Sequence, residues 1–350
     1  MEPFCAAHTM LLDWPGQQAQ RCREGNAMQL FRHAVCTGVL LGALVPVAAS
    51  AQGFPARTVR YIMPLPAGSE TDLFARVLAK QLADGWGQQV VVENRPGGGT
   101  TIGTDLVAKA PADGHAFLHA ISSHGINATL HSKLPYDTLK DFACITQIGN
   151  LYGVLAAHPS FPARNTAELV ALARRLPGQI AYASGGAGTS NHIATEALRL
   201  AAGIDIVHVP YKGSSQAVLD VLPGRVPILA TVLVEAMPYI QAGKLRPIAT
   251  TSPKRAPSLP NLPTIRESLP AYLAGTGFWA LVARAGTPPA ALNKLNADVL
   301  KAMQAADVRA RLASADVEVV GSRPEQCDAF LREQVEVWGR IVKASGARAD

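Results

Sequence analysis

The sequence predicts an α/β fold in which largely parallel sheets are covered by helices. Short apolar stretches that suit strands alternate with longer segments whose apolar residues recur at helical spacing, as in the strand 59–63 and the helix 72–82. Repeated strand–helix units are typical of parallel sheets, because the crossover helices must cover the sheet faces. The chain from Gln52 onward is long enough for one large domain or for two lobes that each bury a core.

The same alternation continues along the chain to a helical C-terminal tail. A proline-rich segment at 253–270 interrupts it, and we expect an extended, irregular surface connection there because proline fixes φ and lacks a donor. The other predicted strands are 89–93, 116–121, 153–157, 179–184, 206–211, 226–231, 245–250 and 278–283, and the other predicted helices are 101–110, 166–176, 190–201, 214–222, 234–242, 289–305 and 324–343.

The N-terminal residues 1–51 have the features of a leader. Arg32 supplies the positive start, residues 34–47 form an apolar run, and Ala49-Ser50-Ala51 matches a signal-peptidase site. The apolar run is too short, and too rich in small residues at its end, for a membrane anchor. We expect residues 28–51 to be a signal peptide, residues 1–27 to be an extension upstream of the true start at Met28, and the exported protein to begin at Gln52.

Composition and charge argue against several classes of function. The formal net charge of +6 is spread along the chain without a basic run or a pattern of stacking aromatics, so we expect no nucleic-acid binding, whereas an anionic ligand suits the charge. Beyond the leader the chain has two cysteines, Cys144 and Cys327, and no C-x-x-C pair. They can form one disulfide in an oxidising compartment, although the sequence does not place them near each other. We expect no metal and no cofactor.

Two strand-to-helix junctions are rich in small residues: residues 63–72 (MPLPAGSETD) and residues 182–192 (YASGGAGTSNH). Small residues let a ligand approach the backbone, and a helix N-terminus offers unpaired N–H groups at the positive end of the helix dipole. Together these features favour an anion site. If both helices point into one cleft, they grip a carboxylate from two lobes.

Purely structural roles for the same residues stay open. Ser69 and Asp72 have the spacing of a capping box, so they can cap the first helix without touching a ligand. Thr189 can cap its own helix in the same way. His192 lies in the first helical turn, where it can bond either a ligand or a neighbouring carbonyl group.

Local nucleotide-binding and catalytic motifs are missing from the sequence. The glycine cluster at 97–103 is one residue too long for a dinucleotide fingerprint, so we expect a tight turn there. Without G-x-S-x-G, H-E-x-x-H or a P-loop, we expect no catalytic residues. Two alternatives stay open: an exported hydrolase that uses Ser184 or Ser69 with His192 oriented by Asp220, and an interaction protein with a vestigial cleft.

A set of short motifs occurs in order from about Phe54 to the C-terminus. It comprises residues 66–76 (PAGSETDLFAR), 92–99 (VENRPGGG), 108–114 (AKAPADG), 134–137 (LPYD), 182–184 with Gly188, Thr189 and His192, 208–213 (HVPYKG), 242–246 (AGKLR), 259–264 (LPNLPT) and 285–288 (AGTP). Each motif is weak alone. In this order, the set resembles the Bug (TctC-type) family of solute-binding receptors of tripartite tricarboxylate transporters.

The resemblance implies a type II periplasmic binding protein. This fold has two α/β lobes with a parallel-type sheet in each, two crossover strands, and a ligand held in the interlobe cleft. By the resemblance, lobe one comprises residues 52–152 and 276–350, and lobe two comprises residues 153–275. The implied function is a periplasmic receptor that captures a small carboxylate and delivers it to a membrane permease or reports it to a signalling partner. We expect the receptor to be a monomer.

The resemblance also implies which residues bind the ligand, through backbone amides and ordered waters. They are Ala67, Gly68, Ser69 and Asp72 from lobe one, Ser184, Gly188, Thr189 and His192 from lobe two, and Ser122 and His124 in a loop that lines the cleft floor.

Three features of this sequence depart from what the family usually has or bear on its ligand. Ser69 replaces a second glycine, which adds a hydroxyl donor and restricts the backbone. Pro227 and the pair Ala230-Thr231 stand where the family often has Asp and Phe-Asp, so Thr231 removes a partner for a ligand ammonium and predicts a carboxylate without a positive amine. Glu70 is expected to face solvent, because in the cleft it would repel an anion.

Overall fold

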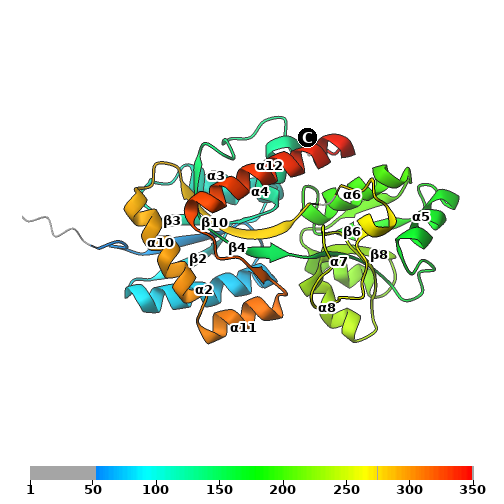
Figure 1. Cartoon of the computed structure of the whole chain (residues 1–350), viewed down its shortest axis with the longest axis horizontal. Helices are drawn as coiled ribbons and strands as arrows, with labels where there is room; N and C mark the ends of the chain where they lie inside the picture. The colour runs from blue at the N-terminus through cyan, green and yellow to red at the C-terminus, as the bar shows by residue number, and fades with distance from the viewer. Residues whose placement is uncertain (1–52, 274, 349–350) are drawn as a thin grey trace, which may run out of the picture. The chain divides into compact units, whose positions relative to one another are not determined.

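The computed structural model describes residues 53–273 and 275–348, and these residues form one compact unit. The predicted leader lies outside the described residues. Two β-sheets, each covered by helices, divide the compact unit into two lobes, so the predicted α/β fold is confirmed (Figure 1). Among the described helices, none has both the length and the apolar character that crossing a membrane requires.

The first lobe is built on a six-stranded sheet in the order β11-β4-β10-β3-β1-β2. The strands β1, β2 and β3 pair in parallel, as the strand–helix repeats predict. β10 runs antiparallel to β3 and β4, because the chain leaves for the second sheet along β4 and returns along β10. The strands are β1 Val59–Met63, β2 Val90–Asn94, β3 Ala116–Ile121, β4 Phe142–Leu151, β10 Gly277–Arg284 and β11 Glu318–Val319.

The second lobe is built on a five-stranded sheet in the order β7-β6-β8-β5-β9. β6 pairs in parallel with β7 and β8, whereas β5 is antiparallel to β8 and β9. The strands are β5 Gly153–Ala157, β6 Ala181–Ser184, β7 Val207–Pro210, β8 Ile228–Val232 and β9 Arg246–Thr250.

Helices cover both faces of each sheet (Figure 1). In the first lobe α2, α10 and α11 share one apolar cluster, and α3 and α12 share the cluster on the opposite face. In the second lobe α5 and α6 cover one face, and α7 and α8 cover the other. The helices are α2 Glu70–Trp86, α3 Thr101–Ala108, α4 Ser123–Leu130, α5 Thr166–Arg175, α6 Ser190–Ala202, α7 Ser214–Val221, α8 Leu233–Gln241, α9 Ile265–Ser268, α10 Pro289–Ala302, α11 Ala306–Ser314 and α12 Pro324–Ser345, and a 3₁₀ turn spans Gly98–Thr100.

The predicted strands and helices are present to within a few residues of their expected bounds, and the elements that the sequence missed include β4, α4, α11 and the short strand β11. The strand β4 is buried along most of its length, so its polar and apolar residues do not alternate. The helix α4 replaces the predicted loop at the cleft floor, and α11 follows α10 after a short break. The proline-rich segment is irregular as expected, apart from the short helix α9.

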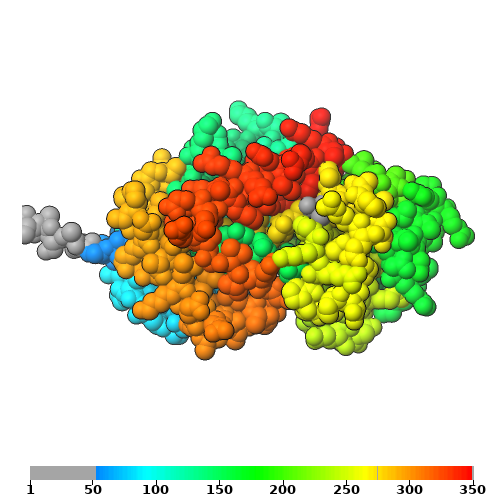
Figure 2. Space-filling view, in the orientation of Figure 1, coloured from blue at the N-terminus to red at the C-terminus, as the bar shows by residue number. Residues whose placement is uncertain are grey.

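The C-terminal helix α12 joins the two lobes. It packs on α4 and β4, and its later residues Trp338, Ile341 and Val342 join the core of the second lobe with Ile193 and Leu198 of α6. Figure 2 shows α12, in red, extending from over the first lobe to the yellow segment of the second lobe. The last helix therefore buries apolar surface in both lobes.

Cys144 and Cys327 form a disulfide, with their Cα atoms 5.7 Å apart. The bridge ties β4 to the first turn of α12, and both cysteines are buried. The sequence left this pairing open, because the partners are 183 residues apart. A structural disulfide suits an oxidising compartment.

Candidate ligand-binding site

A cavity of about 380 Å³ lies between loops that belong to the two sheets. The first lobe contributes Leu151 and the segments 65–71, 121–123 and 277–279 to its walls. The second lobe contributes Gly185, Val232, Val234, Glu235 and the segments 189–191 and 212–216. This volume falls in the range of small-molecule sites. The vestigial, shallow cleft of an interaction protein does not match it.

Helix N-termini converge on this cavity. Within the described chain, α2, α4, α6, α7 and α8 all begin beside residues that line it. The reason is topological, because helices that follow parallel strands start at the carboxyl edge of the sheet, where ligands bind in α/β proteins. The first N–H groups of each helix have no intrahelical acceptor and lie at the positive end of the dipole. The cavity therefore favours an anion.

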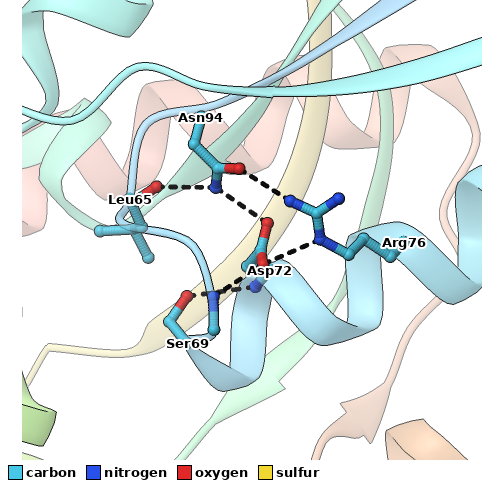
Figure 3. Close-up of polar contacts among 6 residues, drawn as sticks. Leu65, Ser69, Asp72, Arg76 and Asn94 are labelled. Atoms are coloured by element: carbon cyan, nitrogen blue, oxygen red, sulfur yellow. Dashed lines mark hydrogen bonds and ion pairs between the residues drawn. The ribbon is translucent and has the colours of Figure 1, made fainter.

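The buried carboxylate of Asp72 fixes the loop before α2. It accepts hydrogen bonds from the Gly68 N–H at 2.8 Å, from Nε of Arg76 at 3.0 Å and from Nδ2 of Asn94 at 2.8 Å (Figure 3). Ser69 caps α2, and its hydroxyl accepts from the Asp72 N–H at 3.2 Å. Burial raises the pKa of Asp72, but the hydrogen bonds from Arg76, Gly68 and Asn94 outweigh this and lower the pKa. Asp72 therefore stays ionised and holds the loop in shape.

The loop before α6 has the same construction in the second lobe. Thr189 caps α6 and accepts from the His192 N–H at 3.4 Å. Nδ1 of His192 in turn accepts from the Gly188 N–H at 3.2 Å. A Cβ at Gly188 would lie 2.7 Å from a methyl carbon of Leu130, and its φ of +80° also favours glycine. The glycine is therefore required both by the backbone and by the neighbouring side chain.

The two loops match in detail, although they come from different lobes. Gly68 has a φ of +82° against +80° at Gly188, and the caps Ser69 and Thr189 both have a φ of −70°. In each loop the side chain of the third helical residue, Asp72 or His192, accepts a hydrogen bond from the backbone N–H of the glycine before the cap. The first-turn N–H groups that follow the cap, at residues 70–71 and 190–191, have no acceptor within their own helix. Two matched sets of donors therefore lie at one cavity.

A column of polar side chains supports the second loop from behind. Ser184 Oγ lies 2.7 Å from Nε2 of His208. The His208 ring stacks on His192, with ring centroids 4.1 Å apart, and on Tyr182 at 4.9 Å. The Tyr182 hydroxyl donates to Glu196 at 2.7 Å. This column positions His192, which holds the Gly188 N–H.

Both histidines of the column are held neutral. Burial lowers the pKa of His192, and Glu196 opposes this only in part. Burial and the neighbouring His192 lower the pKa of His208 to about 4. A neutral His192 can accept a hydrogen bond on Nδ1, whereas its protonated form has only donors. The loop before α6 therefore keeps its hydrogen bond from Gly188 to His192 only while His192 is neutral.

We expect acidification to destabilise the protein well before its carboxylates titrate. Burial lowers the pKa of His119 to about 3 and that of His124 to about 4, and His208 is lowered to about 4. In the unfolded chain the histidines take up protons near their ordinary pKa of about 6.5. The stability that these three neutral histidines contribute is therefore complete above that pH and is lost as the pH falls toward 4.

Urea unfolding between pH 6 and 5 measures this effect. Each neutral buried histidine adds about 1.4 kcal/mol per pH unit to the slope of stability against pH. The variant His208→Gln is expected to lower the slope by that amount. An unchanged slope in this variant would mean that His208 is not buried in its neutral form.

The structure places half of the ten predicted binding residues at the cavity wall. Ala67, Gly68, Ser69, Ser122 and Thr189 line it, whereas Asp72, His124, Ser184, Gly188 and His192 do not. Asp72, Gly188 and His192 belong to the hydrogen bonds that shape the two loops, and Ser184 supports the second loop through His208. The capping roles that the sequence left open for Ser69 and Thr189 are present in the structure.

The expected loop at Ser122 and His124 is wrong in its secondary structure. Ser123 begins α4, and the cavity wall includes Ser122 and Ser123. His124 is 2% exposed and packs edge-on against Phe142, with ring centroids 4.9 Å apart. The sequence missed α4 because its start combines small residues with a glycine, which disfavour a helix locally.

The expectation that Glu70 faces solvent is also wrong, because Glu70 lines the cavity. Its carboxylate lies 2.7 Å from the guanidinium of Arg311 on α11. The pairing reduces the repulsion that Glu70 would exert on an anion. The sequence could not reveal it, because α11 is remote from the loop along the chain.

Several other residues of the wall were not singled out from the sequence as ligand-binding. They include Lys212, Ser214, Glu235 and Trp279. Lys212 belongs to the motif HVPYKG, which signalled the family without signalling a cavity residue. Glu235 and Trp279 carry no local signal, since they reach the cavity only through the pairing of β8 and β10 in their sheets.

The residues that the structure describes do not form the arrangement that a serine hydrolase needs. Ser184 bonds His208 rather than His192, and the carboxylate of Asp220 accepts from Tyr211 and Arg225. No carboxylate orients His192 beside a serine in the cavity, as the hydrolase alternative requires. Within the described residues, no group of three or more His, Cys, Asp or Glu side chains is placed to hold a metal ion.

Comparison with known proteins identifies the family. The family model of the tripartite tricarboxylate transporter family receptor (TctC) matches residues 74–347. BugT of Bordetella pertussis (strain Tohama I) is 34% identical over 327 residues, which are 92% of this chain and 99% of BugT.

Two solved structures from Rhodopseudomonas palustris share the fold. Rpa4515 with adipate is 31% identical, with a TM-score of 0.78 over 84% of this chain and 99% of that chain. MatC with bound malate is 30% identical, with a TM-score of 0.75 over 83% of this chain and 100% of that chain. The fold, the ordered motifs and these matches agree, and the chain belongs to the Bug (TctC) family of tripartite tricarboxylate transporter receptors.

Proposed function

We propose that this receptor captures a small carboxylate in the cavity between its lobes. The observation that carries the proposal is the pair of matched loops at α2 and α6. Each presents first-turn N–H groups to one cavity from a different lobe. A carboxylate has two oxygens that can each accept several hydrogen bonds, so it suits two facing sets of donors.

The charges around the cavity support an anionic ligand. Lys212 lies at its wall, and the carboxylate of Glu70 is paired with Arg311. The adipate and malate of the R. palustris proteins belong to the same ligand class. We therefore expect recognition that relies on backbone N–H groups, with few charged side chains.

The ten predicted residues divide into two roles under this proposal. The five predicted residues that line the cavity contact the ligand. Two of them, Ser69 and Thr189, also cap α2 and α6 and so shape the loops that present the N–H groups. Asp72 and His192 support binding by fixing the loops from behind. Ser184 acts through His208, so its removal is expected to weaken binding indirectly.

We also propose that the protein works by hinge closure between lobe one, residues 52–152 and 276–350, and lobe two, residues 153–275. A ligand that contacts both lobes binds the closed state more tightly and shifts the equilibrium toward it. Because α12 packs against both lobes, we place the hinge near this helix. The closed receptor, exported to the periplasm as a monomer without catalytic activity, delivers its ligand to a permease or presents it to a signalling partner.

Thermal unfolding of the purified protein against a panel of carboxylates and their neutral amides tests the proposal. A ligand at a hundredfold excess over its Kd adds about 2.7 kcal/mol of stability. We expect a carboxylate to raise Tm by several degrees while its amide does not. Equal stabilisation by an acid and its amide would contradict the proposed anion site.

A further inference from the structure

Glu235 is an acidic side chain in a cavity that otherwise suits anions. It lies in the first turn of α8, directly after β8, and it lines the cavity together with Ser214, Val232 and Val234. The same wall includes Glu70, but Glu70 has Arg311 as its partner. Glu235 therefore raises the question of what its carboxylate binds.

Side chains of the second lobe hold the Glu235 carboxylate in place. The Thr231 hydroxyl donates to Oε2 at 2.6 Å, and the Ser214 side chain also bonds the carboxyl group. Thr231 is fully buried in β8, and Ser214 begins α7. The carboxylate is thus fixed between two elements of the lobe, as a group that recognises a ligand needs to be.

Helix capping does not account for this position. A Glu at the third helical position often accepts from the backbone N–H of the cap, which here is Val232. The described hydrogen bond of Glu235 instead comes from the Thr231 hydroxyl, and α8 has no capping box. The side chain is therefore not engaged in closing its own helix.

The Glu235 carboxylate has no cationic partner among the described residues. Burial raises its pKa, hydrogen bonds from Thr231 and Ser214 oppose the rise, and the charge of Glu70 adds to it. A partly buried carboxylate without a counter-charge is unfavourable unless donors satisfy it. It can accept about four hydrogen bonds, so it retains capacity beyond Thr231 and Ser214.

We propose that Glu235 accepts a hydrogen bond from a hydroxyl or ammonium group of the bound carboxylate. This inference rests on the proposed function and names the ligand class more closely, as hydroxy- or amino-carboxylates. It replaces the expectation, drawn from Thr231 alone, that the ligand carries no positive amine. Thr231 itself holds the acidic side chain of Glu235 at the same end of the cavity. A ligand without a donor group gives Glu235 no hydrogen bond beyond those from Thr231 and Ser214. A second ligand carboxylate beside Glu235 is repelled by its like charge.

Calorimetric titration at pH 7.5 with two matched series tests the proposal. The probes are succinate, malate and aspartate, and propionate, lactate and alanine. In at least one series we expect the hydroxy or amino acid to bind at least tenfold more tightly than its unsubstituted parent. If only the amino acid binds more tightly than its parent, the group that Glu235 binds is an ammonium. If the hydroxy acid binds more tightly than its parent, that group is a hydroxyl.

The variant Glu235→Gln separates the role of the charge from that of the fold. Glutamine can still accept from Thr231, so the cavity keeps its shape. We expect at least a tenfold loss of affinity for the amino acid or a severalfold loss for the hydroxy acid, with the parent acid bound equally or better. The control Glu336→Gln makes the same charge change on the exposed side of α12 and is expected to leave all affinities unchanged.

The outcomes distinguish this inference from the proposed function. Parent acids that bind as tightly as their substituted analogues would overturn the role of Glu235 and leave the carboxylate site intact. So would a Glu235→Gln variant that retains the full preference for the substituted acid over its parent. If neither these six acids nor any carboxylate of the thermal panel binds, the proposed function fails as well.

Discussion

Replacing Trp338 with alanine is expected to lower the free energy of unfolding by about 3–5 kcal/mol. Trp338 is 1% exposed and belongs to the core that α12 shares with the second lobe. Its ring packs directly against Gly275, where any Cβ would collide with the indole. Truncation removes this contact and leaves a cavity where the last helix meets the second lobe.

Urea unfolding followed by circular dichroism measures this loss. The control Arg332→Ala lies on the exposed side of the same helix and is expected to change stability by less than about 0.5 kcal/mol. A loss below about 1 kcal/mol in Trp338→Ala would mean that α12 does not hold the lobes together as described.

Replacing Asp72 with alanine is expected to cost about 2–3 kcal/mol of stability and to weaken carboxylate binding at least tenfold. The substitution leaves the Gly68 N–H, the Asn94 amide and the Arg76 guanidinium without their common acceptor. We place the cost below that of a fully buried ion pair, because the Arg76 side chain is 48% exposed. Binding falls because the loop at Ala67–Ser69 loses the group that shapes it.

A second ion pair on the same helix provides the control. Lys80 and Asp84 are also four residues apart, but their side chains are 69% and 60% exposed. Water and salt screen such an exposed pair, so Asp84→Ala is expected to leave both stability and binding nearly unchanged. Equal effects of the two substitutions, measured by urea unfolding and calorimetry, would exclude the positioning role of Asp72.

The sequence predicted the fold and the positions of the two loops before α2 and α6, because both depend on local patterns. Apolar periodicity fixed the succession of strands and helices, and a glycine followed by a hydroxyl cap identified the starts of α2 and α6. The sequence also raised the capping roles of Ser69 and Thr189 as an alternative to ligand contact. The structure shows the caps, and the two roles are compatible, since a cap shapes the loop that presents the remaining N–H groups.

The remaining features depend on contacts between distant segments. The Glu70–Arg311 pair, the Ser184–His208 hydrogen bond and the Cys144–Cys327 disulfide join residues that no local motif relates. Glu235 reaches the cavity because β8 lies between β6 and β5, an order that the sequence does not state. The position of His124 was missed for a similar reason, because α4 forms under tertiary packing and carries no strong helix signal.

A crystal structure of the receptor with a carboxylate that raises its Tm tests the central claim most directly. The account predicts that the carboxylate oxygens lie within hydrogen-bonding distance, directly or through one water, of first-turn N–H groups of both α2 and α6. A carboxylate that touches one lobe alone would contradict it. So would one held outside this cavity, for example in the surface groove beside Arg266 and Arg340.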